Sequence, residues 1–148
     1  RILDAVVDAG RRVIAPRWFG VAEDRYPAGA ALFTDFEPFE QLYPRCALAI
    51  HQGGVGTQAV GFISDVPQFV TLLTVDHAYF GRRGHELGVS PAPVHLSQVR
   101  PEHVCYALAF ADLPETRARV AEVGARVRAE DGLGNALRFL NRALKLDR

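Results

Sequence analysis

The feature that most constrains this chain is an apolar run that passes directly into a glycine-rich turn. Residues 46–50 read CALAI and residues 51–57 read HQGGVGT. An unbroken apolar run predicts a parallel strand that is covered on both faces. The glycines that follow predict a turn whose backbone adopts positive φ and comes close to a ligand. A short helix is expected directly after the turn, over residues 57–64.

Short apolar strands alternate with helical patterns on both sides of this segment. We expect further strands at residues 13–15, 31–34, 68–73 and 94–96. Helices are expected from Ile2 to a stop at Gly10, over residues 76–87 before Gly88, and in three segments that begin at Pro101, Pro114 and Leu133. This alternation implies a Rossmann-like open parallel α/β sheet with helices on both faces. Ligands of such sheets bind at the carboxyl ends of the strands, so functional residues are sought in those loops.

The length suits one domain with its own core. The chain has 148 residues, of which 49% are hydrophobic and 23% charged, and this composition is typical of a globular protein. It contains no methionine and opens inside a helix that leads directly into the strand at 13–15. Such a helix ordinarily follows a strand. We therefore interpret residues 1–148 as a fragment whose first strand lies upstream.

Composition argues against several kinds of partner. Lys and Arg (17) balance Asp and Glu (17), so no net field favours nucleic acid or a membrane surface. No apolar run reaches membrane-spanning length and no signal-peptide pattern is present, so a cytoplasmic location is expected. Cys46 and Cys105 lack CxxC spacing and are expected to be buried free thiols. The histidines show no HExxH or comparable spacing, so no metal site is expected.

The turn at residues 51–57 has the properties of a phosphate site. The first N–H groups of a helix are unsatisfied and carry partial positive charge. Thr57 can add a hydroxyl donor, and His51 can donate from its ring. The pattern lacks the GK[ST] ending of a P-loop. Two alternatives stay open: residues 54–59, GVGTQA, fit the dinucleotide fingerprint with Asp76 as the ribose-binding acid, or the segment is a plain glycine turn with a surface histidine.

The same residues resemble a known family. HQGGVGT is similar to the HHGGAGT signature of bacterial glycosyltransferases with the two-Rossmann-domain GT-B fold, relatives of antibiotic, sterol and plant UDP-dependent glycosyltransferases. The similarity continues in FEPF at residues 36–39, in DVPQ at residues 65–68 and in the pair Asp76 and His77. It covers nearly the whole chain in order. The resemblance implies that residues 1–148 are the C-terminal, donor-binding domain, with the N-terminal acceptor domain outside the chain.

The resemblance implies a UDP- or dTDP-hexose as donor, bound without a metal or other cofactor. Phe36 would stack on the base, while the backbone of Glu37 reads its edge. Turn residues would hold the diphosphate, and Asp76 and His77 would face the sugar hydroxyls. The implied donor site consists of Phe36, Glu37, His51, Gly53, Gly54, Val55, Gly56, Thr57, Asp76 and His77. No catalytic residue is expected in this chain, because the base of this family lies in the N-terminal domain.

The complete protein is then expected to be an inverting hexosyl-type glycosyltransferase that acts on a small lipophilic or natural-product acceptor. Residues 1–148 alone are expected to transfer no sugar. Six positions depart from the family pattern. Gln52 replaces a second histidine, Gln58 a threonine, Asp65 a glycine and His77 a glutamine. Phe39 stands where many relatives have a polar ribose contact, and Ala59 where plant members carry a ribose-binding glutamate. If that glycine has positive φ, Asp65 has to adopt the same conformation. A nucleotide- or dinucleotide-binding module, or a degenerate homologue without transfer activity, remains the alternative.

Overall fold

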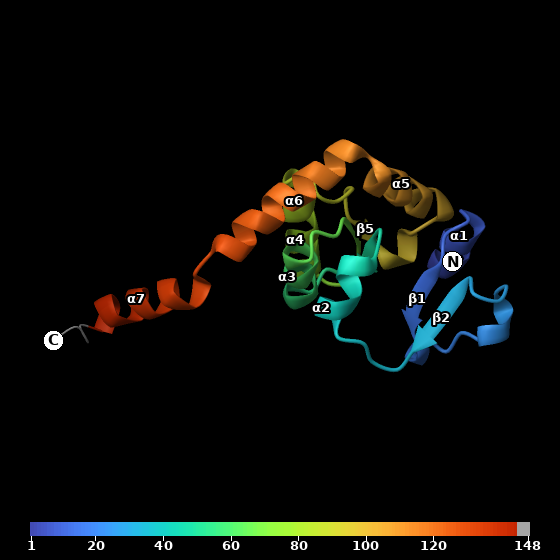
Figure 1. The fold of residues 1–148 in the computed structure, drawn as a ribbon, viewed down its shortest axis with the longest axis horizontal. Coiled ribbons are helices and arrows are strands. Elements are labelled where there is room, and N and C mark those ends of the chain that lie inside the picture. Colours follow the sequence, from blue (N-terminus) through green and yellow to red (C-terminus); the bar gives the residue numbers. More distant parts are fainter. Residues whose placement is uncertain (145–148) are drawn as a thin grey trace.

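The computed structural model describes residues 1–144 and has α/β architecture (Figure 1). The strands are β1 (Val13–Pro16), β2 (Ala31–Thr34), β3 (Ala49–His51), β4 (Gln68–Leu72) and β5 (Val94–His95). The α-helices are α1 (Ile2–Asp8), α2 (Phe39–Leu42), α3 (Val55–Ile63), α4 (Val75–Glu86), α5 (Pro101–Asp112), α6 (Pro114–Ala129) and α7 (Gly132–Leu144). Short 3₁₀ turns are η1 (Arg17–Phe19), η2 (Glu23–Arg25), η3 (Tyr43–Arg45) and η4 (Leu96–Gln98). The predicted alternation of strands and helices is confirmed.

All strand pairs are parallel, as the alternation predicts. β1 pairs with β2, and β4 lies between β3 and β5. The two ladders form separate sheets, because within residues 1–144 no backbone pairing joins β1 to β3. The single open sheet that the sequence predicts is therefore present as two parallel pieces. The predicted first strand would precede residue 1 and remains a prediction.

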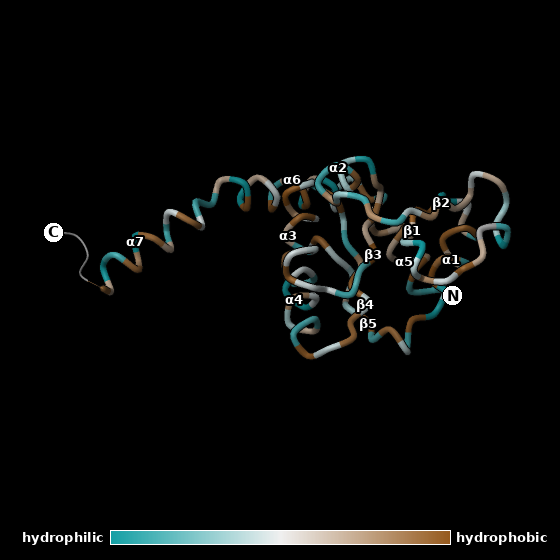
Figure 2. Tube along the Cα trace, turned by 90° about the horizontal axis from the view of Figure 1, so that it is seen from below, coloured by the Kyte–Doolittle hydropathy of each residue, from teal (hydrophilic) through white to brown (hydrophobic). Residues whose placement is uncertain are grey.

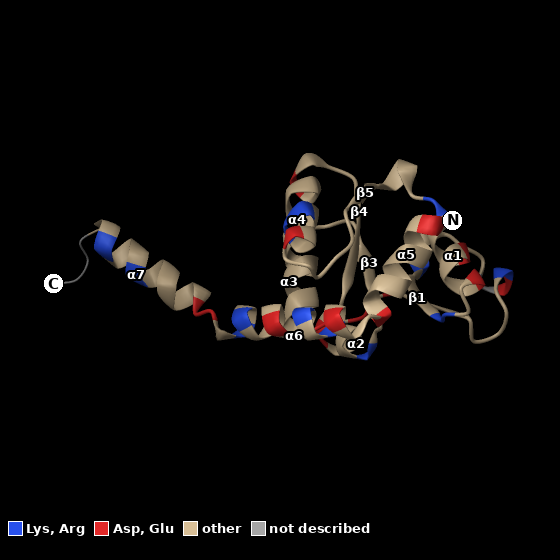
Figure 3. Ribbon diagram, turned by 90° about the horizontal axis from the view of Figure 1, so that it is seen from above, with Lys and Arg blue, Asp and Glu red and all other residues tan. Residues whose placement is uncertain are grey.

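Helices cover both faces of the larger sheet. Figure 3 shows α3 and α4 on one side of β3, β4 and β5, with α5 and α1 on the other. The α1–α5 side contains a core of Ala5, Val6, Phe69, Val99, Val104 and Ala107. On the other side, α6 packs Val120 and Val123 against Val89. The outer surface of α6 carries acidic and basic side chains interspersed (Figure 3), which is typical of a solvated helix face.

Strand β3 differs from its predicted extent. It begins at Ala49, where pairing with Gln68 starts, and not at Cys46. Cys46 still ends the η3 turn, and Ala47 is exposed, so the first residues of the apolar run lead into the strand without belonging to it. The ladder instead extends to His51, which pairs with Val70. The prediction was wrong at this boundary because apolar composition does not show where backbone pairing begins.

Two glycines and an aspartate end helices as the sequence suggests. Gly10 follows α1 with φ of +73°, and Gly88 follows α4 with φ of +74°. Asp65 follows α3 with φ of +53°, the left-handed conformation expected at this position. Its carboxylate lies 2.8 Å from Nη1 of Arg128 on α6. This ion pair joins the end of α3 to α6.

The prediction of two buried thiols was wrong for Cys105. Both cysteines are free, but Cys46 is half-buried and Cys105 is exposed. On α5 the buried positions are Val104, Ala107 and Ala111, which recur at helical spacing. Cys105 follows Val104 by one residue and so lies about 100° around the helix, away from this face.

Helix α7 extends away from the rest of the protein (Figures 1 and 2). Its predicted leucine stripe is present, but Leu133, Leu137, Leu140 and Leu144 are all exposed. Across residues 1–144, no helix combines the length and the apolar character needed to cross a membrane.

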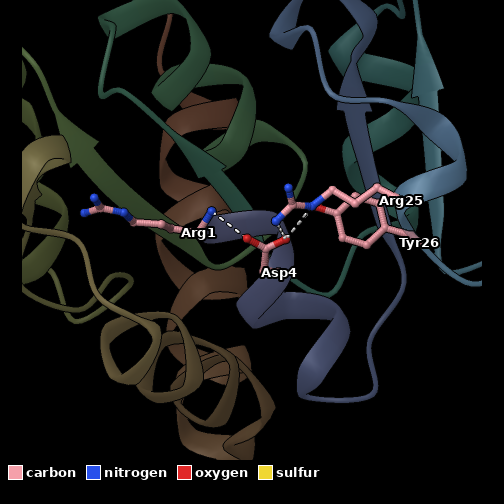
Figure 4. A network of polar contacts seen from close by, with 4 residues as sticks. All are labelled: Arg1, Asp4, Arg25 and Tyr26. Carbon is pink, nitrogen blue, oxygen red and sulfur yellow. Dashed lines mark hydrogen bonds and ion pairs between the residues drawn. The ribbon is translucent and has the colours of Figure 1, made fainter.

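Asp4 connects α1 to the loop before β2 (Figure 4). Its carboxylate lies 2.9 Å from the amino group of Arg1 and 3.0 Å from Nη2 of Arg25, and the Tyr26 hydroxyl donates to it at 2.8 Å. In the 148-residue chain these contacts, the Arg1 amino group first, lower the pKa of Asp4 to about 2. The carboxylate therefore stays charged through the neutral range and holds the loop to α1.

Candidate functional site

The glycine turn lies between the carboxyl end of β3 and the start of α3. Gly53 has φ of +96°, and a Cβ atom there would lie 2.7 Å from Cγ1 of Val70 and 3.2 Å from the carbonyl oxygen of His77. Only glycine therefore fits this position without displacing its neighbours. Gly54 is the N-cap of α3 and has extended backbone. At Gly56 an added Cβ would meet nothing within 4 Å, so this residue faces open space.

The N-terminus of α3 has no side-chain cap within the described part of the chain. Gln58 makes the first helical hydrogen bond, to the carbonyl of Gly54. The N–H groups of Val55, Gly56 and Thr57 precede it and have no helical acceptor. Val55 and Gly56 are exposed and Thr57 is half-buried. The sheet edge thus presents partially positive N–H groups at an accessible position.

His51 lies mostly buried behind the turn, and both of its ring nitrogens are engaged. Nδ1 accepts from the N–H of Gly53 at 3.0 Å, and Nε2 lies 2.8 Å from Oε1 of Gln68. Burial lowers the pKa of His51, and the nearby His77 acts in the same direction. The ring is therefore neutral at pH 7. Direct donation from this ring to a diphosphate remains a prediction, and it would require Nε2 to leave Gln68.

Asp76 and His77 lie in the first turn of α4, which follows the carboxyl end of β4. Asp76 is exposed and accepts a hydrogen bond from the Thr74 hydroxyl, which lowers the pKa of Asp76. The His77 side chain is only 12% exposed and its Nε2 lies 3.9 Å from Asp76 Oδ2. Its Nδ1 is buried and has no hydrogen-bond partner among residues 1–144. The backbone of His77 borders Gly53, so the structure brings His51, Gly53 and His77 together.

Phe36 and Glu37 lie in the loop after β2, and both are exposed, Phe36 by 80%. Phe36 is therefore not a core residue. Arg17 joins this loop to the one after β1, since its Nη2 donates to the Phe33 carbonyl and its Nε lies 3.2 Å from Asp35. Within the described residues no hydrogen bond, ion pair or ring contact joins Phe36 or Glu37 to the glycine turn.

No family model matches the chain. The chain is 38% identical over 141 residues to vancomycin aglycone glucosyltransferase of Amycolatopsis orientalis and 30% identical over 146 residues to a sterol 3-beta-glucosyltransferase of Arabidopsis thaliana. These matches cover 93% and 97% of the chain, but only 33% and 24% of the relatives' own length.

Solved structures share the fold. The glycotransferase of kitacinnamycin has a TM-score of 0.82 at 16% identity, over 95% of this chain and 37% of that one. Glycosyltransferase VinC, solved in complex with dTDP, has a TM-score of 0.77 at 22% identity, again over 95% of this chain and 37% of that one. The chain has the fold of a C-terminal domain of GT-B glycosyltransferases and is related to such enzymes in sequence. Its relatives named here are glycosyltransferases, which favours this interpretation of the turn over the dinucleotide fingerprint.

The GT-B domain also contains candidate site residues that the sequence pattern did not indicate. Gln68 is fully buried and Gln58 almost fully buried, and both lie beside the turn. For Gln68, the sequence signal that could have indicated this role is a glutamine in an otherwise apolar strand. Trp18, which the sequence pattern did not assign to the site, is 68% exposed after β1. Exposed aromatic residues at a sheet's carboxyl edge are a further signal.

One hollow of the GT-B domain lies away from these residues. It has a volume of about 660 Å³ at the end of β5, where Arg1, His95, Arg100 and His103 are among the residues that line it. None of the predicted donor residues lines it. Among the described side chains, no group of three or more His, Cys, Asp or Glu residues is arranged to hold a metal ion.

Proposed function

We propose that this GT-B domain binds a nucleoside diphosphate sugar, a UDP- or dTDP-hexose, at the carboxyl edge of β2, β3 and β4. The observation that carries the proposal is the uncapped N-terminus of α3 behind the turn at Gly53 and Gly54. It belongs to a chain related in sequence to glucosyltransferases. VinC, whose fold this chain shares, was solved in complex with dTDP, which is a ligand of the proposed class.

The α3 N-terminus suits the diphosphate on electrostatic grounds. Its free N–H groups point along a helix dipole that favours negative charge. Negative charge also develops on the diphosphate as it leaves the sugar, so the same groups stabilise the transition state. We propose that this stabilisation suffices without a metal ion. Thr57, in the first turn of α3, adds a hydroxyl donor.

The remaining predicted residues fit the base and the sugar. Phe36 is exposed and free to stack on uracil or thymine, which is worth about 1–3 kcal/mol for base–aromatic stacking. The exposed carboxylate of Asp76 can accept hydrogen bonds from two sugar hydroxyls. His77 has a buried Nδ1 without a partner, next to Asp76, and is the second candidate for a hydroxyl contact.

The transfer step belongs to a longer protein in this proposal. The chain spans about a quarter to a third of the curated relatives it matches. The named relatives act on a sterol and on the vancomycin aglycone. We propose inverting transfer to a small, lipophilic or natural-product acceptor, with the base supplied from outside residues 1–148.

Calorimetry on the 148-residue chain tests donor binding. UDP and dTDP are titrated against the protein, with NAD as the competing ligand class. The expected result is heat of binding for UDP, dTDP or both, and weaker or undetectable binding for NAD. Preference for NAD would contradict the proposal and support the dinucleotide-binding alternative.

A further inference from the structure

Gln68 is a polar residue in the most buried strand of the protein. It is 0% exposed, and its neighbours along β4 are Phe69 and Val70, both fully buried. Burial of an amide is unfavourable unless its oxygen and nitrogen find hydrogen-bond partners. Both atoms do so: Oε1 lies 2.8 Å from Nε2 of His51, and Nε2 donates to the Gln58 carbonyl at 3.3 Å.

The direction of these hydrogen bonds is fixed from both ends. The N–H of Gly53 can only donate, so Nδ1 of His51 accepts and carries no proton. The proton of the neutral ring is then on Nε2, which donates to Oε1 of Gln68. At the other end the Gln58 carbonyl can only accept, so it meets the Gln68 amide nitrogen. If the Gln68 amide were rotated by 180°, its NH₂ group would face the Nε2–H donor of His51 and its oxygen would face the Gln58 carbonyl, and neither pair can form a hydrogen bond.

The same network reaches both helices that flank the turn. The Gln58 side chain donates to the Phe80 carbonyl on α4 at 2.9 Å, and its N–H donates to Gly54 at the start of α3. Two helix glycines make room for the amides. A Cβ at Gly61 would lie 2.4 Å from Cδ of Gln68, and one at Gly84 would lie 3.0 Å from Nε2 of Gln58. The amides therefore sit in a space that the sequence keeps open.

We propose that Gln68 is a positioning residue for the donor site: it fixes His51 as the Nε2–H tautomer, so that Nδ1 holds the Gly53 N–H and with it the turn. The role rests on the proposed function, because the turn sets the direction of the N–H groups of α3. Gln68 itself does not touch the donor. It acts through His51, whose Nδ1 accepts only while that atom is unprotonated.

Two substitutions separate this role from a structural one. Gln68→Met keeps a buried side chain of similar length but removes the acceptor, so His51 loses one of the two partners that select its tautomer and keeps only the Gly53 N–H. Gln68→Glu keeps an acceptor for Nε2–H, and its charge stabilises the imidazolium, which would place an Nδ1 proton against the Gly53 N–H. The control is Phe69→Leu, a change in the same strand on the α1–α5 side of the sheet, which is expected to lower stability without affecting His51.

The experiment is nitrogen-15 NMR of the histidine side chains in the 148-residue chain, first without nucleotide. We expect His51 of the wild type and of Phe69→Leu to show a protonated Nε2 and an unprotonated Nδ1 at pH 7. Gln68→Met is expected to give a mixture of tautomers, and Gln68→Glu to move the His51 titration to higher pH. A wild-type ring protonated on Nδ1, or a tautomer unchanged in Gln68→Met, overturns the proposal. The wild-type spectrum alone shows which ring nitrogen of His51 carries the proton, so the proposal can be overturned even if the variants fail to fold.

Titration with UDP and dTDP then connects the tautomer to binding. Gln68→Met is expected to bind about tenfold more weakly, the change that corresponds to about 1.4 kcal/mol, and Phe69→Leu to bind as the wild type does. Equal affinity of Gln68→Met and wild type overturns the positioning role. Failure of the wild type to bind either nucleotide contradicts the proposed function. The His51 tautomer is measured without nucleotide, so that result does not depend on whether the domain binds UDP or dTDP.

Discussion

A Cβ atom at Gly53 would lie 2.7 Å from Cγ1 of Val70, closer than two carbon atoms approach without displacement. The residue also has φ of +96°. Gly53→Ala is therefore expected to lower the free energy of unfolding by about 1–3 kcal/mol, through strain and overpacking together. Urea unfolding measures the difference.

Gly56→Ala is the matched control for that change. Gly56 lies in the first turn of α3, where a Cβ meets nothing within 4 Å. Alanine there is expected to be neutral or to stabilise by about 0.5–1 kcal/mol, because glycine is unfavourable in helices. Equal stability losses for the two variants would show that the turn tolerates a side chain at Gly53.

Phe36 is exposed whereas Phe33, three residues earlier, is buried. Phe36→Leu is expected to leave the melting temperature almost unchanged and to weaken nucleotide binding by about 1–3 kcal/mol, the range for a lost base stack. Phe33→Leu is expected to lower the melting temperature instead. A thermal melt and a UDP titration of both variants distinguish the roles, and full UDP affinity in Phe36→Leu would remove this residue from the site.

The buried His51 predicts a pH dependence of stability. Its pKa in the folded protein lies below the ordinary value of 6.5, so the unfolded chain binds the proton more readily. Stability is therefore complete above about pH 6.5 and falls as the pH drops below it, by at most about 1.4 kcal/mol per pH unit for one group.

Unfolding by urea at pH 7.5 and 5.5 tests this contribution. His51→Gln removes the titrating group and is expected to show a smaller loss between the two pH values than the wild type. His95→Gln, at an exposed histidine, serves as the control and is expected to behave as the wild type does. A loss in His51→Gln as large as in the wild type would assign the acid sensitivity to other groups.

Asp65 combines left-handed backbone with an ion pair to Arg128. Asp65→Asn keeps a residue that tolerates this backbone and removes only the charge. It is expected to cost at most about 1 kcal/mol, since both partners are partly exposed. Asp65→Ala is expected to cost about 1 kcal/mol more, because alanine is strained at positive φ. Denaturant midpoints compare the two, and equal costs would mean that the backbone conformation contributes nothing.

The order of the elements could be predicted because it depends on local patterns. Apolar runs and helix-stopping glycines such as Gly10 and Gly88 recur along the chain, and each acts within a few residues. The boundaries of strands and the face of a helix that is buried depend instead on residues far away in the sequence. The start of β3 at Ala49 is set by pairing with Gln68, and the exposure of Cys105 by the face of α5 that packs on α1.

The candidate site shows the same division. The turn follows from HQGGVGT, but α3 begins at Val55 and not at residue 57 as predicted. The structure also places His77 beside Gly53. The His51–Gln68–Gln58 network did not follow from the pattern. Its members are 17 and 10 residues apart in sequence. They meet because β3 pairs with β4 and because α3 lies against Gln68 at Gly61. Phe36 and Glu37 remain predicted contacts, since no hydrogen bond, ion pair or ring contact joins either residue to the turn within the residues described.

The central claim, that the α3 N-terminus holds a diphosphate, is tested most directly by calorimetry of UDP and dTDP binding to Gly56→Asp and Gly56→Asn. The two side chains have nearly the same shape, and a Cβ at Gly56 meets open space, so they differ chiefly in charge. Both variants are expected to fold, and an acidic residue in the first turn even favours the helix. The account predicts that Gly56→Asp binds at least about tenfold more weakly than Gly56→Asn, a difference of about 1.4 kcal/mol from charge repulsion. Equal nucleotide affinities of the two variants would contradict it.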